Sequence, residues 1–139
     1  MTAKKFVIEL KSTLDGLPVI ADFVDDALKH LKADSGTIYK VQLAVDEACT
    51  NVINYAYPHG PGPLKITIEP EGRDALIIIN DQGKAFDPTS VPPPDLAPDL
   101  EQRKIGGLGI YFMKKLMDSI SYSFHPREGN TLTLRKKLP

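Results

Sequence analysis

One apolar run constrains the fold of this chain more than any other feature of the sequence. Residues 75–79 read Ala-Leu-Ile-Ile-Ile, and the strand that they predict extends to Asn80. Such a strand is typical of the interior of a sheet, so we expect both of its faces to be covered. Residues 64–69 alternate apolar and polar side chains, which predicts a neighbouring strand with one buried face. A turn over residues 71–74 connects the two strands.

The other predicted elements follow from the spacing of apolar residues. Phe6, Ile8 and Leu10 share one face of a short strand over residues 6–10. Helical spacing and strand patterns predict five more elements: helices over residues 18–31, 37–57 and 106–118, and a final strand pair over residues 119–125 and 131–138.

In the last of these helices, four apolar residues are expected to face inward: Leu108, Phe112, Leu116 and Met117. Because strands and helices do not alternate strictly, the order of elements predicts an α+β fold. We expect a two-layer α/β sandwich in which helices cover one face of a mixed, mostly antiparallel sheet. The length of 139 residues fits a single domain over residues 1–139.

Composition and charge exclude several classes of protein. Lys and Arg number 17 against 18 Asp and Glu, so the chain lacks the basic excess of a nucleic-acid-binding protein. Its one cysteine, Cys49, rules out a disulfide within the chain and suits a reducing compartment. The apolar runs are too short to span a bilayer, and the N-terminal segment lacks the apolar core of a signal peptide. We therefore expect a cytoplasmic protein that binds neither nucleic acid nor membrane.

Three polar residues interrupt the apolar pattern of the second predicted helix. Glu47, Asn51 and Asn54 lie at positions i, i+4 and i+7, so they share one helical face. Asparagine is a poor helix former, and two of them within a helix call for a reason. One interpretation is a solvated face, or a buried amide that caps a neighbouring turn. The other is a site for magnesium and a nucleotide, in which an Asn carbonyl binds Mg²⁺ and the Glu orients or deprotonates an attacking hydroxyl.

A second polar feature follows the apolar strand directly. Residues 80–86 read Asn-Asp-Gln-Gly-Lys-Ala-Phe. An Asp at the end of a strand, followed by Gly, is commonly a turn, and that interpretation stays open. The alternative is recognition of a base. In that case the Asp81 carboxylate accepts a hydrogen bond from the exocyclic amine of adenine, and Gly83 lets the backbone come close to the ring.

Glycines open the third predicted helix. Residues 106–109 read Gly-Gly-Leu-Gly, which exposes backbone N–H groups where the helix dipole favours an anion. The spacing is neither that of a P-loop nor that of a Rossmann fold. Before it, residues 82–105 lose all periodicity and contain five of the 12 prolines. A loop of this length within a compact domain is either functional or disordered.

Taken in order, these features resemble a known family. Four segments carry the likeness: residues 46–57, 80–88, 106–118 and 129–134. They are similar to the boxes of the GHKL ATP-binding domain, found in gyrase, a heat-shock chaperone, histidine kinases and mismatch-repair ATPases. More closely, they resemble the stand-alone anti-sigma-factor serine/threonine kinases of bacterial partner-switching systems, whose second box typically ends Phe-Asp-Pro, as residues 86–88 do here. The resemblance implies the Bergerat (GHKL) ATP-binding fold.

The resemblance also implies roles for individual residues. Glu47 would polarise the nucleophile, and Asn51 would bind Mg²⁺. Asp81 would bind the adenine amine, with Gly83 beneath the ring. Gly107 and Gly109 would present amides to the phosphates, and Thr131 would contact Asp81 or its water. The full set of implied nucleotide contacts is Asn51, Asn54, Asp81, Gly83, Phe86, Gly106, Gly107, Leu108, Gly109 and Thr131.

Residues 84–105 would form the lid over ATP, with Arg103 or Lys104 able to meet the γ-phosphate. The sequence departs from the family at Asn130, where Thr is usual. It also departs at residues 84–86, where other branches have a further Gly.

The function implied by the resemblance is that of an ATP- and Mg²⁺-dependent serine/threonine protein kinase. Such a protein sequesters a sigma factor as a homodimer and phosphorylates the antagonist that would release it. Because the chain ends where the likeness ends, we expect it to act through another protein. Three alternatives remain at this point. One is a non-catalytic module that senses ATP or ADP and switches partners, the second is a kinase whose client is a phosphatase or another signalling protein, and the third is a structural α+β protein with no ligand.

Overall fold

A five-stranded sheet forms one layer of the protein, whose computed structural model describes residues 4–90 and 107–139. The strand order is β1-β2-β3-β5-β4, so the predicted apolar strand, β3, is central. The strands are β1 (Phe6–Lys11), β2 (Pro63–Glu71), β3 (Asp74–Asp81), β4 (Ser119–His125) and β5 (Gly129–Lys137). All four neighbouring pairs of these described strands are antiparallel, which confirms the α+β class and makes the sheet more regular than the mixed sheet expected.

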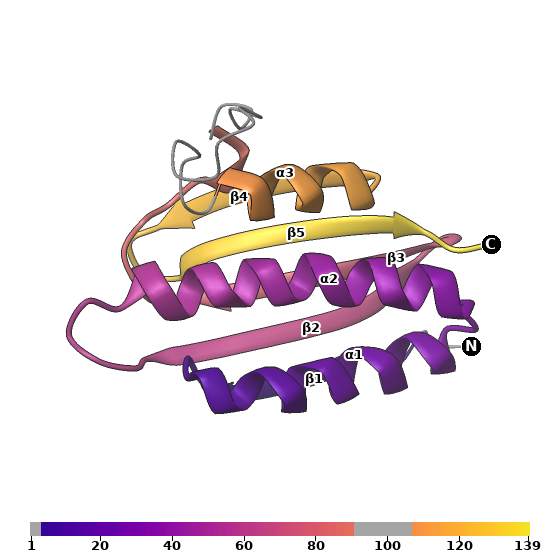
Figure 1. Cartoon of the computed structure of the whole chain (residues 1–139), viewed down its shortest axis with the longest axis horizontal. Helices are drawn as coiled ribbons and strands as arrows, with labels where there is room; N and C mark the ends of the chain where they lie inside the picture. The colour runs from indigo at the N-terminus through magenta and orange to yellow at the C-terminus, as the bar shows by residue number, and fades with distance from the viewer. Residues whose placement is uncertain (1–3, 91–106) are drawn as a thin grey trace, which may run out of the picture.

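Three α-helices form the second layer, and all of them lie on the same side of the sheet (Figure 1). They are α1 (Leu17–His30), α2 (Ser35–Asn51) and α3 (Gly107–Leu116). Helix α2 lies between the other two and packs against both. A proline in the first turn of α1 is compatible with helix initiation, because the N–H that it lacks has no helical partner there. Asp34 caps α2 by accepting a hydrogen bond from the backbone N–H of Thr37 at 2.8 Å.

The core lies between these layers and is built from alternate residues of the strands. On β3, Ile77 and Ile79 face the helices and are at most 2% exposed. The expectation that both faces of this strand are covered is wrong, because no described helix lies on the other face. Leu76 and Ile78 point to that open face, where neighbouring strands shield them sideways: Ile78 is flanked by Thr67 of β2 and by β5. The central position of β3 in the sheet accounts for its apolar run, so no layer of helices on the open face is needed to explain it.

The inward face of α3 also differs from the prediction. Ile110, Met113 and Met117 are the buried residues near this helix, whereas the Phe112 side chain is 50% exposed. The apolar residues of α3 cover more than one face, so their spacing alone does not tell which subset packs against α2 and the sheet. The side chain of Leu108 lies outside the described part of the structure. Within the described ranges, no helix combines the length and the apolar character needed to cross a bilayer.

Candidate functional site

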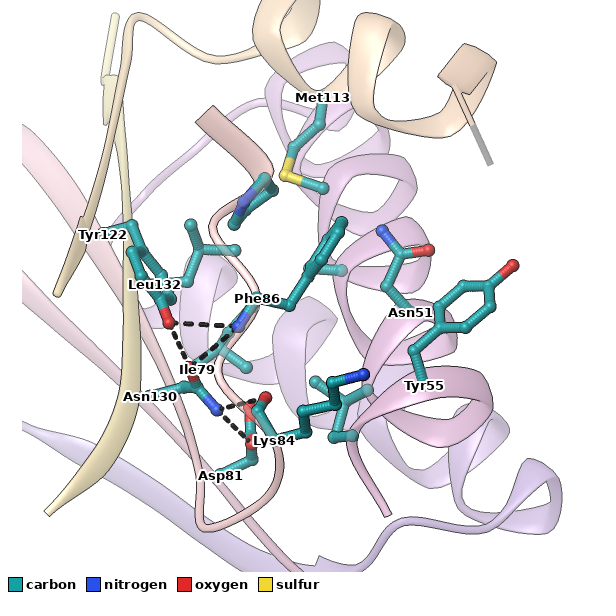
Figure 2. Close-up of a pocket in the computed structure, with 14 residues that line it drawn as sticks. Asn51, Tyr55, Ile79, Asp81, Lys84, Phe86, Met113, Tyr122, Asn130 and Leu132 are labelled. Carbon is teal, nitrogen blue, oxygen red and sulfur yellow. Dashed lines mark hydrogen bonds between the residues drawn. The ribbon is translucent and has the colours of Figure 1, made fainter. Parts of the chain in front are cut away.

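A pocket opens where the ends of α2, β3 and β5 meet the start of the loop after β3 (Figure 2). The space between its walls is about 470 Å³ when the part open to solvent is included. Apolar side chains such as Ile79, Met113 and Leu132 form much of its lining. The polar side chains among them come from α2, from the turn after it, from three strands and from the loop after β3. This combination of apolar walls and convergent polar groups is typical of a ligand site.

Asp81 supplies the acidic group of the pocket. It ends β3 and is only 6% exposed. Its Oδ1 accepts hydrogen bonds from Asn130 Nδ2 at 2.8 Å and from the backbone N–H of Gly83 at 2.9 Å. Burial raises the pKa of this carboxyl, and those two hydrogen bonds oppose the rise. No salt bridge among the described residues reaches it. A buried carboxylate without a cationic partner is suited to accept from a neutral donor such as an amine.

Asn130, and not Thr131, reaches Asp81 from β5. In the register of the sheet Asp81 lies opposite Asn130, and Asn80 lies opposite Thr131. Consecutive residues of a strand point to opposite faces, so Thr131 faces the open side of the sheet. There its Oγ1 accepts a hydrogen bond from Asn80 Nδ2 at 2.8 Å. The contact between Thr131 and Asp81 that the resemblance implied is therefore absent. Asn130, which stands where Thr is usual in the family, makes the contact with Asp81 instead.

The polar stripe of α2 is only partly gathered at the pocket. Asn51 ends the α-helix and lines the pocket. After it the chain widens into a π-helical turn, η2 (Val52–Ala56). Such turns occur often at functional sites, and they take more residues per turn than an α-helix does. The expected common face is lost beyond Asn51. Asn54 is exposed and is not part of the pocket lining, whereas Tyr55, one residue later, lines it.

Phe86 lies over the middle of the pocket. Its side chain is 42% exposed, and Figure 2 shows the ring directed toward the side of the pocket formed by Asn51 and Met113. This places an aromatic ring between the acidic end, at Asp81, and the amide of Asn51. The sequence prediction that Phe86 belongs to the site agrees with this position.

Glu47 lies one helical turn before Asn51, against α3. A Cβ placed on Gly109 would collide with its Oε2, so this carboxylate occupies the space that the missing side chain leaves. Burial raises the pKa of Glu47, and the negative charge of neighbouring Asp46 adds to the rise. A carboxyl with a raised pKa is a better proton acceptor than an ordinary one, which suits a general base.

Gly83 allows a close approach, although its neighbour is protein backbone. A Cβ at this position would collide with the carbonyl group of Ala56 at the end of η2. The next residue, Lys84, donates its backbone N–H to that same carbonyl at 2.7 Å. The glycine thus lets the loop after β3 pack onto the end of η2, which brings Asp81 and Asn51 to one pocket.

Several predicted positions lie outside this description. Gly106, Arg103, Lys104 and most of the expected lid over residues 84–105 fall outside the described residues. Gly107 begins α3, and the side chain of Leu108 is not described. Tyr122 was missed by the sequence analysis: its hydroxyl donates to Asn130 Oδ1, a contact that depends on strand pairing and has no local signal. Cys49 is buried and its pKa is raised to about 12, as expected of an inert thiol.

The residues present fit Mg²⁺ held together with a nucleotide better than a metal ion held by protein alone. Asn51 offers one hard, neutral carbonyl oxygen beside the pocket. Among the described residues no group of three or more His, Cys, Asp and Glu could hold a metal ion. Magnesium commonly takes one or two protein ligands, with phosphates and waters as the others.

Comparison with known proteins identifies the family of this chain. Residues 10–136 match the histidine kinase-like ATPase domain. The chain is 35% identical over 98 residues to the serine/threonine-protein kinase BtrW of Bordetella bronchiseptica, covering 69% of this chain and 68% of that protein. It is 36% identical over 87 residues to the serine-protein kinase RsbW of Halalkalibacterium halodurans, covering 60% of this chain but only 53% of that protein. This chain belongs to the histidine kinase-like ATPase domain family.

A solved structure supports the fold independently. A crystal structure of the RsbU and RsbW domains of a Mycobacterium tuberculosis protein matches 97% of this chain with a TM-score of 0.70. The match covers 32% of that longer chain, at 16% identity, so it is a likeness of fold. The predicted GHKL-type fold and the predicted kinship with serine/threonine protein kinases are confirmed.

Proposed function

We propose that this chain is an ATP-dependent serine/threonine protein kinase that sequesters a sigma factor and phosphorylates the antagonist of that sequestration. The observation that carries the proposal is the pocket itself. It holds a buried carboxylate, Asp81, and a metal-binding type of amide, Asn51, in a chain of this ATPase family that is 35% identical to a protein named as a serine/threonine kinase. The names of the relatives support the kinase activity. The partner-switching role rests on the resemblance of the four sequence segments to that family.

Each residue of the site has a chemical task in this proposal. Asp81 accepts a hydrogen bond from the adenine amine, and Asn51 holds Mg²⁺ through its side-chain oxygen. The backbone N–H groups at the start of α3, at Gly107 and Gly109, face the phosphates with the favourable end of the helix dipole. Glu47 accepts the proton of the incoming Ser or Thr hydroxyl, for which its raised pKa suits it. Mg²⁺, when bound, supplies positive charge that offsets the charge of the phosphates.

The broader setting is part of the same proposal. We place the protein in the cytoplasm as a homodimer, with residues 1–139 forming a single ATP-binding domain whose lid spans residues 84–105. Its partners are a sigma factor and an anti-sigma-factor antagonist, and it binds neither nucleic acid nor membrane. The near balance of 17 basic and 18 acidic residues supports the absence of nucleic-acid binding.

Phosphate transfer from γ-labelled ATP to a candidate antagonist protein tests the proposal. The substitution Glu47→Gln should lower the transfer rate by at least about 100-fold, because the general base is lost. ATP affinity, measured by calorimetry, should stay within about threefold, since Glu47 does not line the base pocket. Asp22→Asn is a matched control, because it removes an exposed carboxylate from α1, far from the pocket lining.

Two results would count against the proposal in different ways. If the unaltered protein bound Mg-ATP but transferred no phosphate to any antagonist, the kinase claim would fail and the non-catalytic nucleotide-sensing module would remain. If Glu47→Gln transferred phosphate at the normal rate, Glu47 would not be the base.

A further inference from the structure

Asn130 makes more hydrogen bonds than a simple contact with Asp81 requires. Its Nδ2 donates to Asp81 Oδ1 at 2.8 Å, to the carbonyl oxygen of Lys84 at 3.0 Å and to that of Gly83 at 3.3 Å. Its Oδ1 accepts from the hydroxyl of Tyr122 and from the backbone N–H of Phe86 at 3.4 Å. The partners determine the orientation of the amide, because acceptors surround its nitrogen and donors face its oxygen. Figure 2 shows this cluster at the acidic end of the pocket.

The two carboxylate oxygens of Asp81 differ in their hydrogen bonding. Both hydrogen bonds to this carboxylate from described residues end on Oδ1. Every buried side-chain nitrogen or oxygen atom of the described residues has a hydrogen-bond partner. Asp81 Oδ2 accepts neither of the two hydrogen bonds. If it were fully buried it would be an unpaired buried atom, and the described residues contain none, so Oδ2 remains accessible. Since Asp81 lines the pocket, Oδ2 is the acceptor left for a ligand.

We propose that Asn130 is a positioning residue that selects a 6-amino purine over a 6-oxo purine: it holds Oδ1 of Asp81 and thereby presents Oδ2 to the base. The inference rests on the proposed function, because it assumes that a purine nucleotide occupies the pocket. A carboxylate oxygen accepts from the amino group of adenine, whereas the 6-oxo group of guanine would bring a second acceptor against it. Asn130 touches the carboxylate and the loop, and acts on the base through Asp81.

An amide does this better than the Thr usual in the family. A Thr hydroxyl has one proton to donate, so it could bond to Asp81 or to a loop carbonyl, but not to both. The amide donates to Asp81 and to the loop at once, and its oxygen accepts from Tyr122. Tyr122 also accepts from the backbone N–H of Phe86 at 3.2 Å. One side chain from β5 thus ties Asp81, the loop after β3 and β4 into one unit.

Titration of ATP and GTP, each with magnesium, into the purified full chain tests this. Asn130→Ala should weaken ATP binding about tenfold and GTP binding much less, so the ratio of the two affinities falls. Asn130→Thr should recover part of the ratio, because one donor to Asp81 returns. Tyr122→Phe keeps the ring and should give an intermediate loss. Thr133→Val is the matched control: it lies on the same strand but opposite Ile78, on the face away from the pocket, and should leave both affinities unchanged.

The pH dependence of ATP binding separates positioning from a general loss of structure. Asn130 lowers the pKa of Asp81, so in Asn130→Ala the pH below which ATP binding is lost should move upward. The other titratable groups that interact with Asp81 are Tyr57 and Tyr122, whose raised pKa values keep them neutral in acid. Lys84, in the pocket lining, is present in both proteins, so it cancels in the comparison.

The outcomes distinguish the two proposals. If the unaltered protein fails to bind ATP, the proposed function falls, and this inference falls with it. If it binds ATP, and Asn130→Ala keeps both the affinity ratio and the pH midpoint, the inference alone is overturned. Should Asn130→Ala fail to fold, as judged by circular dichroism, Asn130→Thr and Tyr122→Phe decide: an unchanged ratio in both overturns the inference, and a lowered ratio supports it.

Discussion

The two ends of the β3–β5 strand pair each carry an acidic cluster, and the clusters are built in opposite ways. At one end Asp74 and Glu71 accept from the Arg135 guanidinium at 2.8 and 2.9 Å, so the carboxylates have a cation beside them. At the other end Asp81 has only the neutral donors of Asn130 and Gly83, and it lies buried. The first end is a partly exposed ion-pair cluster, and the second is a buried carboxylate with one oxygen still available.

The contrast between the two ends indicates which kind of acidic residue is available for binding a ligand. A carboxylate beside arginine has its charge offset within the protein, and solvent screens what remains. A buried carboxylate held by neutral donors keeps its charge uncompensated, which costs stability and favours a ligand that brings a donor. Perturbed titratable groups gather at functional sites for this reason. The end of the pair at Asp81 is therefore the one for which we propose a binding function.

The largest effect is expected from Asp81→Asn. Asn130 and Gly83 require an acceptor at the position of Oδ1, so the new amide would place its NH₂ group where Oδ2 was. That NH₂ would face the adenine amine, donor against donor. ATP affinity should fall about 100-fold, and affinity for GTP, whose 6-oxo group is an acceptor, should rise relative to ATP. Calorimetric titration of both nucleotides measures this, and an unchanged ATP affinity would remove Asp81 from the site.

The same variant sharpens the comparison through the pH dependence of stability. Burial raises the pKa of Asp81 in the folded state, so the folded protein binds a proton more readily than the unfolded chain. Between the ordinary pKa of Asp and this raised value, the free energy of unfolding therefore falls as the pH rises. The ionised Asp81 therefore destabilises the fold near neutral pH. Asp81→Asn lacks this charge and should be more stable than the unaltered protein at that pH. Urea unfolding of both proteins at a series of pH values measures the difference; identical pH profiles would contradict it.

A smaller effect is expected from Gly83→Ala. The new Cβ would meet the backbone carbonyl of Ala56, which cannot move aside as a side chain can. We expect the free energy of unfolding to fall by about 1–3 kcal/mol, as in overpacked cores, together with ATP affinity. Gly36→Ala is the matched control. Its Cβ would make only an ordinary van der Waals contact, at 3.8 Å from Asp34 Oδ1 at the start of α2, so it should be neutral or slightly stabilising. Equal melting temperatures for the two variants would show that the close approach does not matter.

The smallest effect is expected at the opposite end of the strand pair, from Arg135→Gln. The ion pair with Glu71 is exposed to solvent and the one with Asp74 is half-buried, so their loss should lower the melting temperature only slightly, and less still in high salt. ATP affinity should stay within about twofold, because the pocket is at the other end of β3. A large loss of ATP binding in this variant would break the contrast between the two ends.

Much of the fold could be predicted because its signals are local. The period of two in β2 and the helical spacing in α1 were read from neighbouring residues, and their bounds agree with the structure to within a few residues. The acidic turn at Asp81 and the amide of Asn51 were found for the same reason, since each belongs to a short motif. The exposed position of Asn54 could not be predicted, because nothing in the sequence indicates the π-helical turn after Asn51.

The elements, their order and the chemical groups that the pocket could use all follow from local sequence, because hydrophobic periodicity and short motifs depend on neighbours in the chain. Only the tertiary structure decided that Asn130 faces Asp81 while Thr131 faces away, and that Tyr122 completes the cluster. The physical reason is strand register. A shift of one residue between β3 and β5 would exchange the two faces, and that register is set by contacts between segments far apart in sequence.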